Sequence, residues 1–138
     1  PALTPSKMEM CSTSAFKHGQ VVWAKSNKTS PFWPSLVLDP NSDKIPKHIR
    51  ETFVAHYSSR YIVRFLASEK FGFVQFNNIQ NFGDDNPNHT QLRKQKVISN
   101  QEKIFEYGIQ LGEKLLIEYK RKYSTLSLLM KLVGTRRG

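Results

Sequence analysis

The chain has 138 residues, of which 38% are hydrophobic and 12% aromatic, and its 21 Lys and Arg residues against 11 Asp and Glu residues give a net charge of +10. This composition excludes a disordered tail and a membrane protein, because no stretch approaches the roughly 18 apolar residues of a spanning helix. The length fits one compact domain with flanking segments. The positive charge predicts an anionic partner, which could be nucleic acid, an anionic membrane or an acidic protein.

Residues 1–15 are polar, Ser-rich and aperiodic, and they are predicted to form a disordered leader. The chain opens on Pro1 without a signal-peptide pattern, which indicates a segment of a longer protein. Cys11 is the only cysteine and lies in the leader. A single cysteine excludes an intramolecular disulfide and a cysteine-based zinc site, and it fits a reducing compartment.

Short β-rich runs bounded by turn formers occupy residues 16 to about 82. A short polar connection at 67–70 predicts a hairpin, and Gly72 inside its second strand predicts a tight bend or bulge. Several short strands at close spacing favour a small closed or half-closed barrel over an open sheet. The predicted strands cover 19–25, 35–39, 60–66 and 71–77, and residues 78–82 form either a fifth strand or a turn.

The segment between the second and third strands is too long for a tight hairpin, and a short inserted helix is predicted there. Asp43 is the expected N-cap, and Pro46 is tolerated only in the first helical turn. The helical spacing is carried by Ile45, Ile49, Phe53 and His56.

Helical character returns at about residue 89 and continues to about 133, so the prediction is an α+β fold in which a helical bundle follows the barrel. Ser99 and Glu102 have the spacing of a capping box before a long helix. Residues 124–133 are predicted to form a second, short helix, and residues 134–138 a frayed tail. Two apolar rows with glycines for close approach mark the long helix: Ile104, Gly108, Leu111 and Leu115, and Phe105, Ile109, Gly112 and Leu116.

Catalytic motifs find little support in the sequence. The four histidines lie in different segments without metal-ligand spacing, and no glycine-rich phosphate loop is present. Asp84 and Asp85 are adjacent in a turn-rich loop, where a solvated turn explains them. We therefore expect no enzyme activity, no metal and no cofactor.

Three motifs occur in order: FKHGQVVWAK at 16–25, PFWP at 31–34, and the pair YIVRFL and FGFVQF at 61–66 and 71–76, followed by a basic helical tail. Together they resemble a PWWP domain, one of the Tudor-like chromatin readers, with Phe32 in place of the first Trp of the name. The resemblance covers about residues 16–123, within a predicted domain at 16–133 whose barrel spans about 16–82 and whose helices span about 89–133. It implies a five-stranded β-barrel followed by helices, with a variable insertion between the second and third strands.

The resemblance also implies a function. Family members bind a methylated histone lysine in an aromatic cage and nucleosomal, double-stranded DNA through an adjacent basic surface. A trimethylammonium keeps its charge but donates no hydrogen bond, so aromatic faces attract it through cation–π interactions. The expected setting is the nucleus, as a monomeric module of a larger protein that contacts the nucleosome and no membrane.

Trp33 and Phe65 match the family's cage positions. The third wall commonly comes from the residue before the first proline of the motif, and Ser30 stands there. Phe32 or Trp23 is a candidate for the missing wall. For Trp23 the alternative is a plain core residue, because alternation in a buried strand explains it fully.

The resemblance assigns DNA contact to a basic run before the long helix and to lysines after the first strand. A solvated lysine-rich surface is the alternative explanation of this charge. A second functional hypothesis is a nucleic-acid-binding or protein-interaction barrel without methyl-lysine recognition, in which the aromatics are core residues. The DNA-contact candidates are Lys25, Lys28, Arg93, Lys94 and Lys96.

Overall fold

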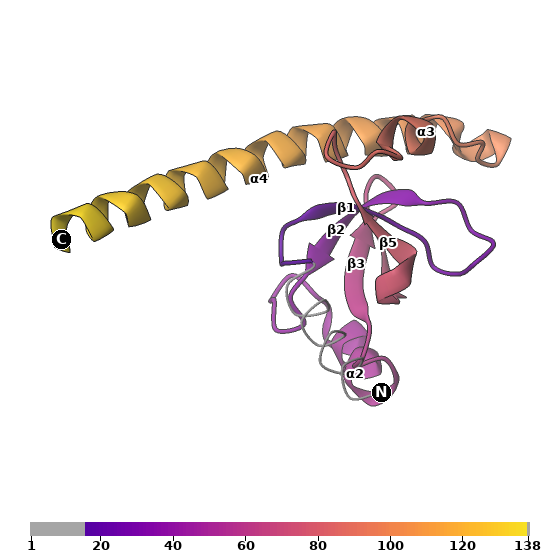
Figure 1. The fold of residues 1–138 in the computed structure, drawn as a ribbon. Coiled ribbons are helices and arrows are strands. Elements are labelled where there is room, and N and C mark those ends of the chain that lie inside the picture. The colour runs from indigo at the N-terminus through magenta and orange to yellow at the C-terminus, as the bar shows by residue number, and fades with distance from the viewer. Residues whose placement is uncertain (1–15, 138) are drawn as a thin grey trace, which may run out of the picture.

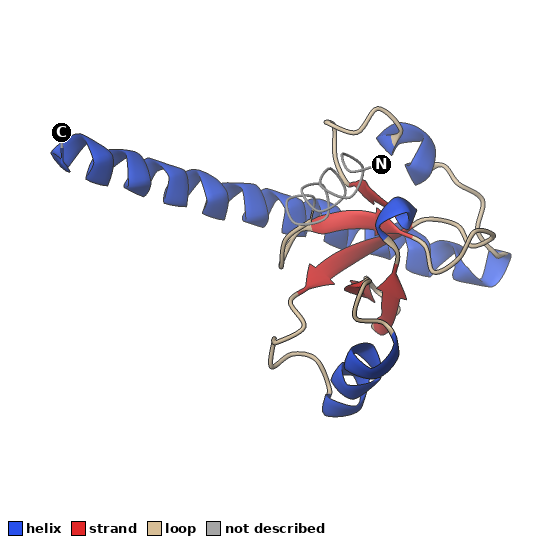
Figure 2. Ribbon diagram, turned by 60° about the horizontal axis from the view of Figure 1, so that its bottom comes forward, coloured by secondary structure: helices blue, strands red, loops and turns tan. Residues whose placement is uncertain are grey.

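The computed structural model describes the backbone of residues 16–137 and the side chains of residues 16–125 and 129. The predicted leader, with Cys11, and Gly138 lie outside the described residues. A sheet lies between a short helix and a long one (Figures 1 and 2). The elements in chain order are β1 (Val21–Ala24), β2 (Trp33–Leu38), α2 (Lys47–His56), β3 (Tyr61–Phe65), β4 (Lys70–Val74), a 3-10 turn (Phe76–Asn78), β5 (Ile79–Asn81), α3 (His89–Arg93), a second 3-10 turn (Ser99–Gln101) and α4 (Glu102–Arg137).

The five strands form one antiparallel sheet in the order β4-β3-β2-β1-β5. The stretch that the sequence left as strand or turn contains both, because β5 follows a 3-10 turn. In the described residues no pairing joins the outer strands β4 and β5, so the hydrogen-bonded sheet is open. Its closure into a barrel stays a prediction.

Strand β1, which lies between β2 and β5, is buried on both faces, as its apolar sequence VVWA requires. Val21 and Trp23 belong to a core cluster that also contains Phe105 of α4. Val22 and Ala24 belong to a second cluster built from the strands. The sheet therefore has α4 on one face and a core formed by its own strands on the other.

Helix α2 lies between β2 and β3, where the sequence places a helix, and it sits at the end of the sheet away from α4 (Figure 1). The predicted cap is wrong, because α2 begins at Lys47 with Pro46 in the cap position and without a side-chain cap bond. The amide of Ile45 donates to the carbonyl of Ser42 (3.3 Å), so Asp43 lies inside a turn that precedes the helix. Arg50 closes this turn by donating from Nε to the carbonyl of Pro40 (3.0 Å).

The buried face of α2 differs by one residue from the predicted one. Ile45 and Phe53 are buried as expected, but His56 is exposed. Tyr57, directly after the helix, instead stacks on Phe73 of β4 with ring centroids 4.9 Å apart. These aromatic contacts fasten the insertion to the sheet edge.

Helix α4 is one uninterrupted helix of 36 residues, so the predicted separate helix at 124–133 is wrong. Residues 113–133 contain no Gly or Pro to break it, and the hydroxyl of Thr125 donates to the carbonyl of Arg121 (3.0 Å) within the helix. At about 1.5 Å per residue the helix is about 54 Å long. Its second half extends past the sheet and continues to Arg137, through most of the segment expected to be frayed (Figure 1). In the described part of the chain, no helix combines the length and apolar character of a membrane span.

The start of α4 also differs from the prediction. Ser99 lies in a 3-10 turn that has no side-chain cap bond, so the predicted capping box does not form. The second of the two predicted rows supplies the buried contact, with Phe105 and Ile109 only 4% and 2% exposed. Ile104, which begins the first row, is 41% exposed.

Candidate functional site

The proline-bounded motif at 31–34 forms the corner at which the chain enters β2. Trp33 is the first residue of β2 and is half-buried. Its indole Nε1 donates to the carbonyl of Leu66 (2.8 Å), and its ring packs edge-to-face on Phe105 with centroids 5.1 Å apart. These contacts fix the indole between the β3–β4 turn and α4.

Phe65 ends β3 and faces Ser35 of β2 across the sheet. Trp33 is two residues before Ser35 in β2, so the register makes it a diagonal neighbour of Phe65. Diagonal neighbours lie roughly 7–8 Å apart, within reach of aromatic side chains. The two sequence-predicted cage residues are therefore neighbours in the register, but their side chains pack on different clusters, Phe65 on the strand cluster and Trp33 on the α4 cluster.

Gly72 provides the space under Phe65. A Cβ at Gly72 would lie 2.6 Å from Cε2 of the Phe65 ring, which is closer than real Cβ contacts. Pairing between β3 and β4 runs regularly through Gly72, opposite Val63. The predicted bend or bulge is therefore wrong. Because Gly72 has no side chain, the Phe65 ring can instead pack directly on its backbone.

Ser30 and Trp23, two residues that the sequence associates with the third wall of the predicted cage, make other contacts in the structure. Ser30 is held inside the β1–β2 loop, because its amide and its hydroxyl donate to Oδ1 of Asn27 at 3.0 and 2.9 Å. Trp23 is 0% exposed, and its Nε1 donates to Nδ1 of His89 (3.0 Å). A fully buried ring cannot line an open pocket, so the core interpretation accounts for Trp23.

Phe32 is half-buried and already has a cation over its ring. The Lys25 ammonium lies 4.8 Å from the ring centroid. The main chain of Phe32 is held by Gln95, whose Oε1 accepts from the Phe32 amide (3.0 Å) and whose Nε2 donates to the Phe32 carbonyl (3.1 Å). Sequence analysis missed Gln95, since a glutamine among lysines carries no distinctive pattern.

The Phe32–Gln95 contact joins residues 63 positions apart and brings the basic run beside the β1–β2 loop. Lys28, Lys94 and Lys96 are exposed and Lys25 is half-buried. Arg93 is also exposed, but its guanidinium pairs with Glu113 of α4 at 3.1 Å. The Phe32–Gln95 contact therefore holds the segment of Lys94 and Lys96 against the motif at 31–34, and the Arg93 charge is partly neutralised.

His89 is a second residue that the sequence did not single out. It is buried, and its Nδ1 accepts from Trp23 Nε1 and from the amide of Gly83 (3.1 Å). Burial lowers the pKa of His89 and the nearby Arg93 charge lowers it further, against the opposing effect of Asp84, Asp85 and Glu113. Two donors at Nδ1 require a neutral imidazole with its proton on Nε2.

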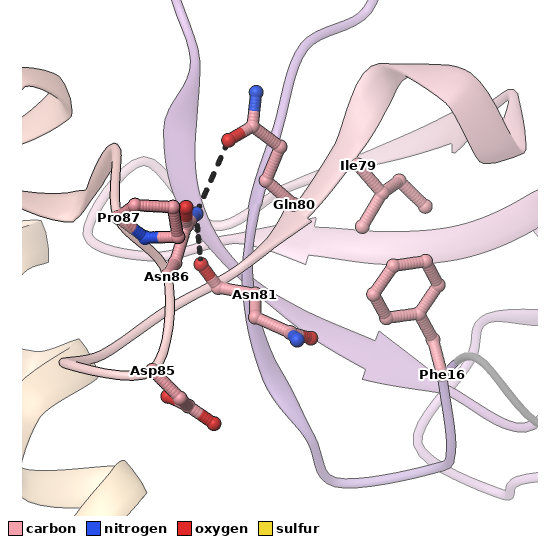
Figure 3. A pocket seen from close by; sticks show the side chains of 7 residues that line it. All are labelled: Phe16, Ile79, Gln80, Asn81, Asp85, Asn86 and Pro87. Carbon is pink, nitrogen blue, oxygen red and sulfur yellow. Dashed lines mark hydrogen bonds between the residues drawn. The ribbon is translucent and has the colours of Figure 1, made fainter.

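A shallow hollow of about 290 Å³ lies beside β5 (Figure 3). Nδ2 of Asn86 donates to Oε1 of Gln80 (3.1 Å) and to the carbonyl of Asn81 (2.7 Å). These bonds fasten the loop at 83–88 to β5 and so position the start of α3. The lining residues are Phe16, Ile79, Gln80, Asn81, Asp85, Asn86 and Pro87.

A larger hollow of about 590 Å³ lies between the β3–β4 turn and α4. It adjoins the corner, because the Trp33 indole bonds to the carbonyl of Leu66 in its wall. Two residues of the turn, Ala67 and Glu69, have left-handed φ angles of 72° and 61°. The lining residues are Arg64, Leu66, Ala67, Glu69, Tyr107, Leu111, Lys114, Leu115 and Glu118. No group of three or more metal-binding side chains occurs among the described residues.

Comparison with known proteins gives a consistent result. The model of the PWWP domain family matches residues 19–116. The solution structure of the second PWWP domain of the WHSC1L1 protein has 21% sequence identity and a TM-score of 0.56, and the match covers 77% of this chain and 87% of that one. A crystal structure of WHSC1L1-PWWP2 has 18% identity and a TM-score of 0.46, and the match covers 83% and 96%.

Proposed function

The chain belongs to the PWWP domain family, a family of chromatin-associated reader modules, and from this premise we propose that it binds a methylated histone lysine and nucleosomal DNA with one face. The observation that carries the proposal is the corner itself. Trp33 and Phe65 are diagonal neighbours in the β2–β3 register, and the Phe32–Gln95 contact supports a basic surface beside them, because it holds the segment of Lys94 and Lys96 against the same motif.

Trp33 and Phe65 are the proposed walls of the methyl-lysine site, with a trimethylated lysine as the preferred ligand. Contacts within the domain hold both rings in place: the Trp33 indole donates a hydrogen bond to the carbonyl of Leu66, and the Phe65 ring packs on Gly72. Rings that are held in place lose little freedom on binding. The polar loop at Ser30 leaves this side of the site without an aromatic wall, so we expect a low affinity.

The larger hollow is the proposed path for the peptide that flanks the methyl-lysine. It begins at Leu66, directly after Phe65, and contains an apolar floor from Leu66, Leu111 and Leu115. Glu118 in its lining suits the basic side chains of a histone tail, whereas Glu69 is already paired with Arg64 at 3.3 Å.

Lys25, Lys28, Lys94 and Lys96 are the proposed contacts to the DNA backbone. Each phosphate that a lysine neutralises releases counterions, so the affinity falls steeply with salt. Weak binding to DNA and weak binding to a histone tail reinforce each other on a nucleosome, because the first contact raises the local concentration of the second. The proposed location is accordingly the nucleus.

A second candidate function is a nucleic-acid-binding or protein-interaction module without methyl-lysine recognition. Ser30 bonded to Asn27 and Phe32 occupied by Lys25 favour it, since both reduce the aromatic surface open to a ligand.

Peptide titration separates the two functions. Amide resonances of the labelled chain would be followed while unmodified and trimethylated histone peptides of the same sequence are added. The reader function predicts a preference for the trimethylated peptide, with shifts centred on Trp33 and Phe65. Equal responses to both peptides would leave only the second candidate.

Phe65→Leu tests the cage assignment without removing a hydrogen bond. We expect its affinity for the trimethylated peptide to fall about 3- to 10-fold, the size of one good cation–π contact. Phe71→Leu is the matched control, because Phe71 is half-buried on the neighbouring strand but packs toward α2. Trp33→Ala is unsuitable, since it would also remove the bond to Leu66 and the packing on Phe105. Identical losses in the two phenylalanine variants would contradict the assignment.

A further inference from the structure

Gln95 joins the aromatic corner to the basic run, and we propose that it is a positioning residue for DNA binding. It would act by fixing Lys94 and Lys96 relative to Lys25 so that all contact one duplex. This inference rests on the proposed DNA-binding function, and it assigns to Gln95 a role that does not require contact with DNA.

The Gln95 amide acts on Phe32 as a neighbouring strand would. It accepts from the Phe32 amide (3.0 Å) and donates to the Phe32 carbonyl (3.1 Å), the pattern of a hydrogen-bonded pair in an antiparallel sheet. Its Nε2 also donates to the carbonyl of Leu92 in α3 (2.8 Å). One half-buried side chain therefore bonds to both the corner and α3, while Lys94 and Lys96 on either side of it are exposed.

Phe32 links Gln95 to a third lysine, Lys25. Its backbone is bonded to Gln95, and its ring lies under the Lys25 ammonium at 4.8 Å. Lys25 begins the β1–β2 loop, so its backbone is held by the sheet, where its amide donates to the carbonyl of Asn78 (3.1 Å). Charges from two segments about 70 residues apart in the sequence, at Lys25 and at Lys94 and Lys96, are thereby held in one arrangement.

Such an arrangement suits a duplex, which presents phosphates at fixed spacing. Lysines that are already in place lose less freedom on binding than lysines on a loose connector. Among the described residues, the bonds of Gln95 are the only side-chain hydrogen bonds that join residues 94–98 to the corner. Removing these bonds should leave the lysine charges unchanged, but the distances from Lys94 and Lys96 to Lys25 should no longer be fixed.

Gln95→Met tests the inference, because Met retains the length and volume of Gln and loses both polar ends. Gln91→Met is the matched control, since Gln91 is exposed on α3 and has no side-chain bond to the corner. Fluorescence anisotropy with a short duplex of mixed sequence would be measured at several salt concentrations. We expect Gln95→Met to bind about 3- to 10-fold more weakly and Gln91→Met to change less than about 2-fold.

A double-mutant cycle separates positioning from a general structural effect. In a chain that already carries Lys94→Ala and Lys96→Ala, Gln95→Met should cause no further loss of DNA affinity, because the charges it positions are gone. An equal loss in both backgrounds would overturn the inference. Should Gln95→Met fail to fold in thermal unfolding experiments, Gln95→Asn replaces it, since its shorter amide cannot reach both groups of Phe32.

The outcomes distinguish the inference from the function on which it rests. If the unaltered chain binds the duplex without salt dependence, or if Lys94→Ala with Lys96→Ala has no effect, the proposed DNA-binding function fails. If that double variant does weaken binding while Gln95→Met behaves as Gln91→Met, only the positioning role of Gln95 is refuted.

Discussion

Trp23 owes its place in the core to one hydrogen bond at its polar atom. A buried indole N–H without an acceptor is costly, and here Nδ1 of His89 accepts it at 3.0 Å. The amide of Gly83 uses the same nitrogen at 3.1 Å. His89 therefore joins β1 to the loop before α3, and it can do so only while Nδ1 carries no proton.

Stability should consequently fall in mild acid. The pKa of His89 is lowered in the folded chain from its ordinary value of 6.5, so between the two values the unfolded chain binds more protons. Above about pH 6.5 the neutral imidazole makes its full contribution to the free energy of unfolding. This contribution is lost as the pH falls toward the lower pKa of His89 in the folded chain. Thermal unfolding between pH 7.5 and about pH 5, above most carboxylate titration, measures it.

His89→Gln is the informative variant, because its side-chain oxygen can accept a hydrogen bond but does not titrate in this range. We expect a less stable chain whose stability changes less over the same pH interval. His56→Gln, at an exposed site on α2, is the control and should retain the pH dependence of the unaltered chain. A pH dependence unchanged in His89→Gln would refute the role of this imidazole.

At the scale of elements, α4 reaches the sheet through two glycines. A Cβ at Gly112 would lie 2.9 Å from Cζ of Phe82, and one at Gly108 would lie 3.1 Å from the carbonyl oxygen of Leu66. Phe82 is 2% exposed and has little room to move. The close approach of α4 brings Phe105 against Trp33, so the helix supports the corner directly.

Gly112→Ala should therefore destabilise the fold, although alanine favours a helix by up to about 1 kcal/mol over glycine. We expect a net loss of about 1–2 kcal/mol in the free energy of unfolding, as in other overpacked cores. Gln110→Ala, on the exposed side of the same turn, should stay within about 0.5 kcal/mol. Chemical denaturation of the two variants measures the difference, and a Gly112→Ala chain more stable than the original would contradict this packing.

Some secondary-structure elements follow from the local sequence pattern, whereas the starts and ends of the helices depend on contacts with neighbouring segments. The first four strands and the insertion helix follow from short β-branched runs and helical spacing, so the sequence predicts them within a few residues, whereas it left the fifth strand open as a strand or a turn. The cap at Asp43 and the capping box at Ser99 fail because neighbouring turns take up the backbone groups that the caps would use. The break expected before residue 124 fails because Ser124 and Thr125 do not end a helix where the surrounding stretch, residues 113–133, contains no Gly or Pro.

At the scale of the whole molecule, the net charge of +10 is less informative than its distribution. The corner gathers Lys25, Lys28, Lys94 and Lys96, whereas Lys120–Lys122 lie on α4, well along the helix. Both groups are exposed apart from half-buried Lys25, so exposure alone cannot separate them. Their different positions allow a charge-matched test.

Lys94→Glu with Lys96→Glu should weaken binding to a short duplex and lower the slope of log affinity against log salt by about 2 or more. The preference for a trimethylated peptide should survive. Lys120→Glu with Lys122→Glu changes the net charge equally and should have a smaller effect on both quantities. Equal losses in the two variants would show that only the overall charge matters.

The site was only partly predictable from sequence. Motif and spacing predict Trp33 and Phe65 as cage residues, and the register makes them diagonal neighbours, while their role in binding stays a prediction. Gln95 and His89 could not be predicted, because their roles arise from hydrogen bonds to Phe32 and Trp23, which lie far away in the chain. A glutamine or histidine has many possible partners, and only the fold selects one.

The bond between Phe32 and Gln95 also makes one amide proton an indicator of local opening. Phe32 precedes β2 and so lies outside the hydrogen-bond ladder, where an amide would ordinarily exchange quickly with solvent. Its proton is instead held by the Gln95 side chain from the segment after α3, and it exchanges when that side chain releases it. The hydrogen-exchange rate at Phe32 thus reports how often the contact between Gln95 and the aromatic corner opens, without a ligand or a label on either.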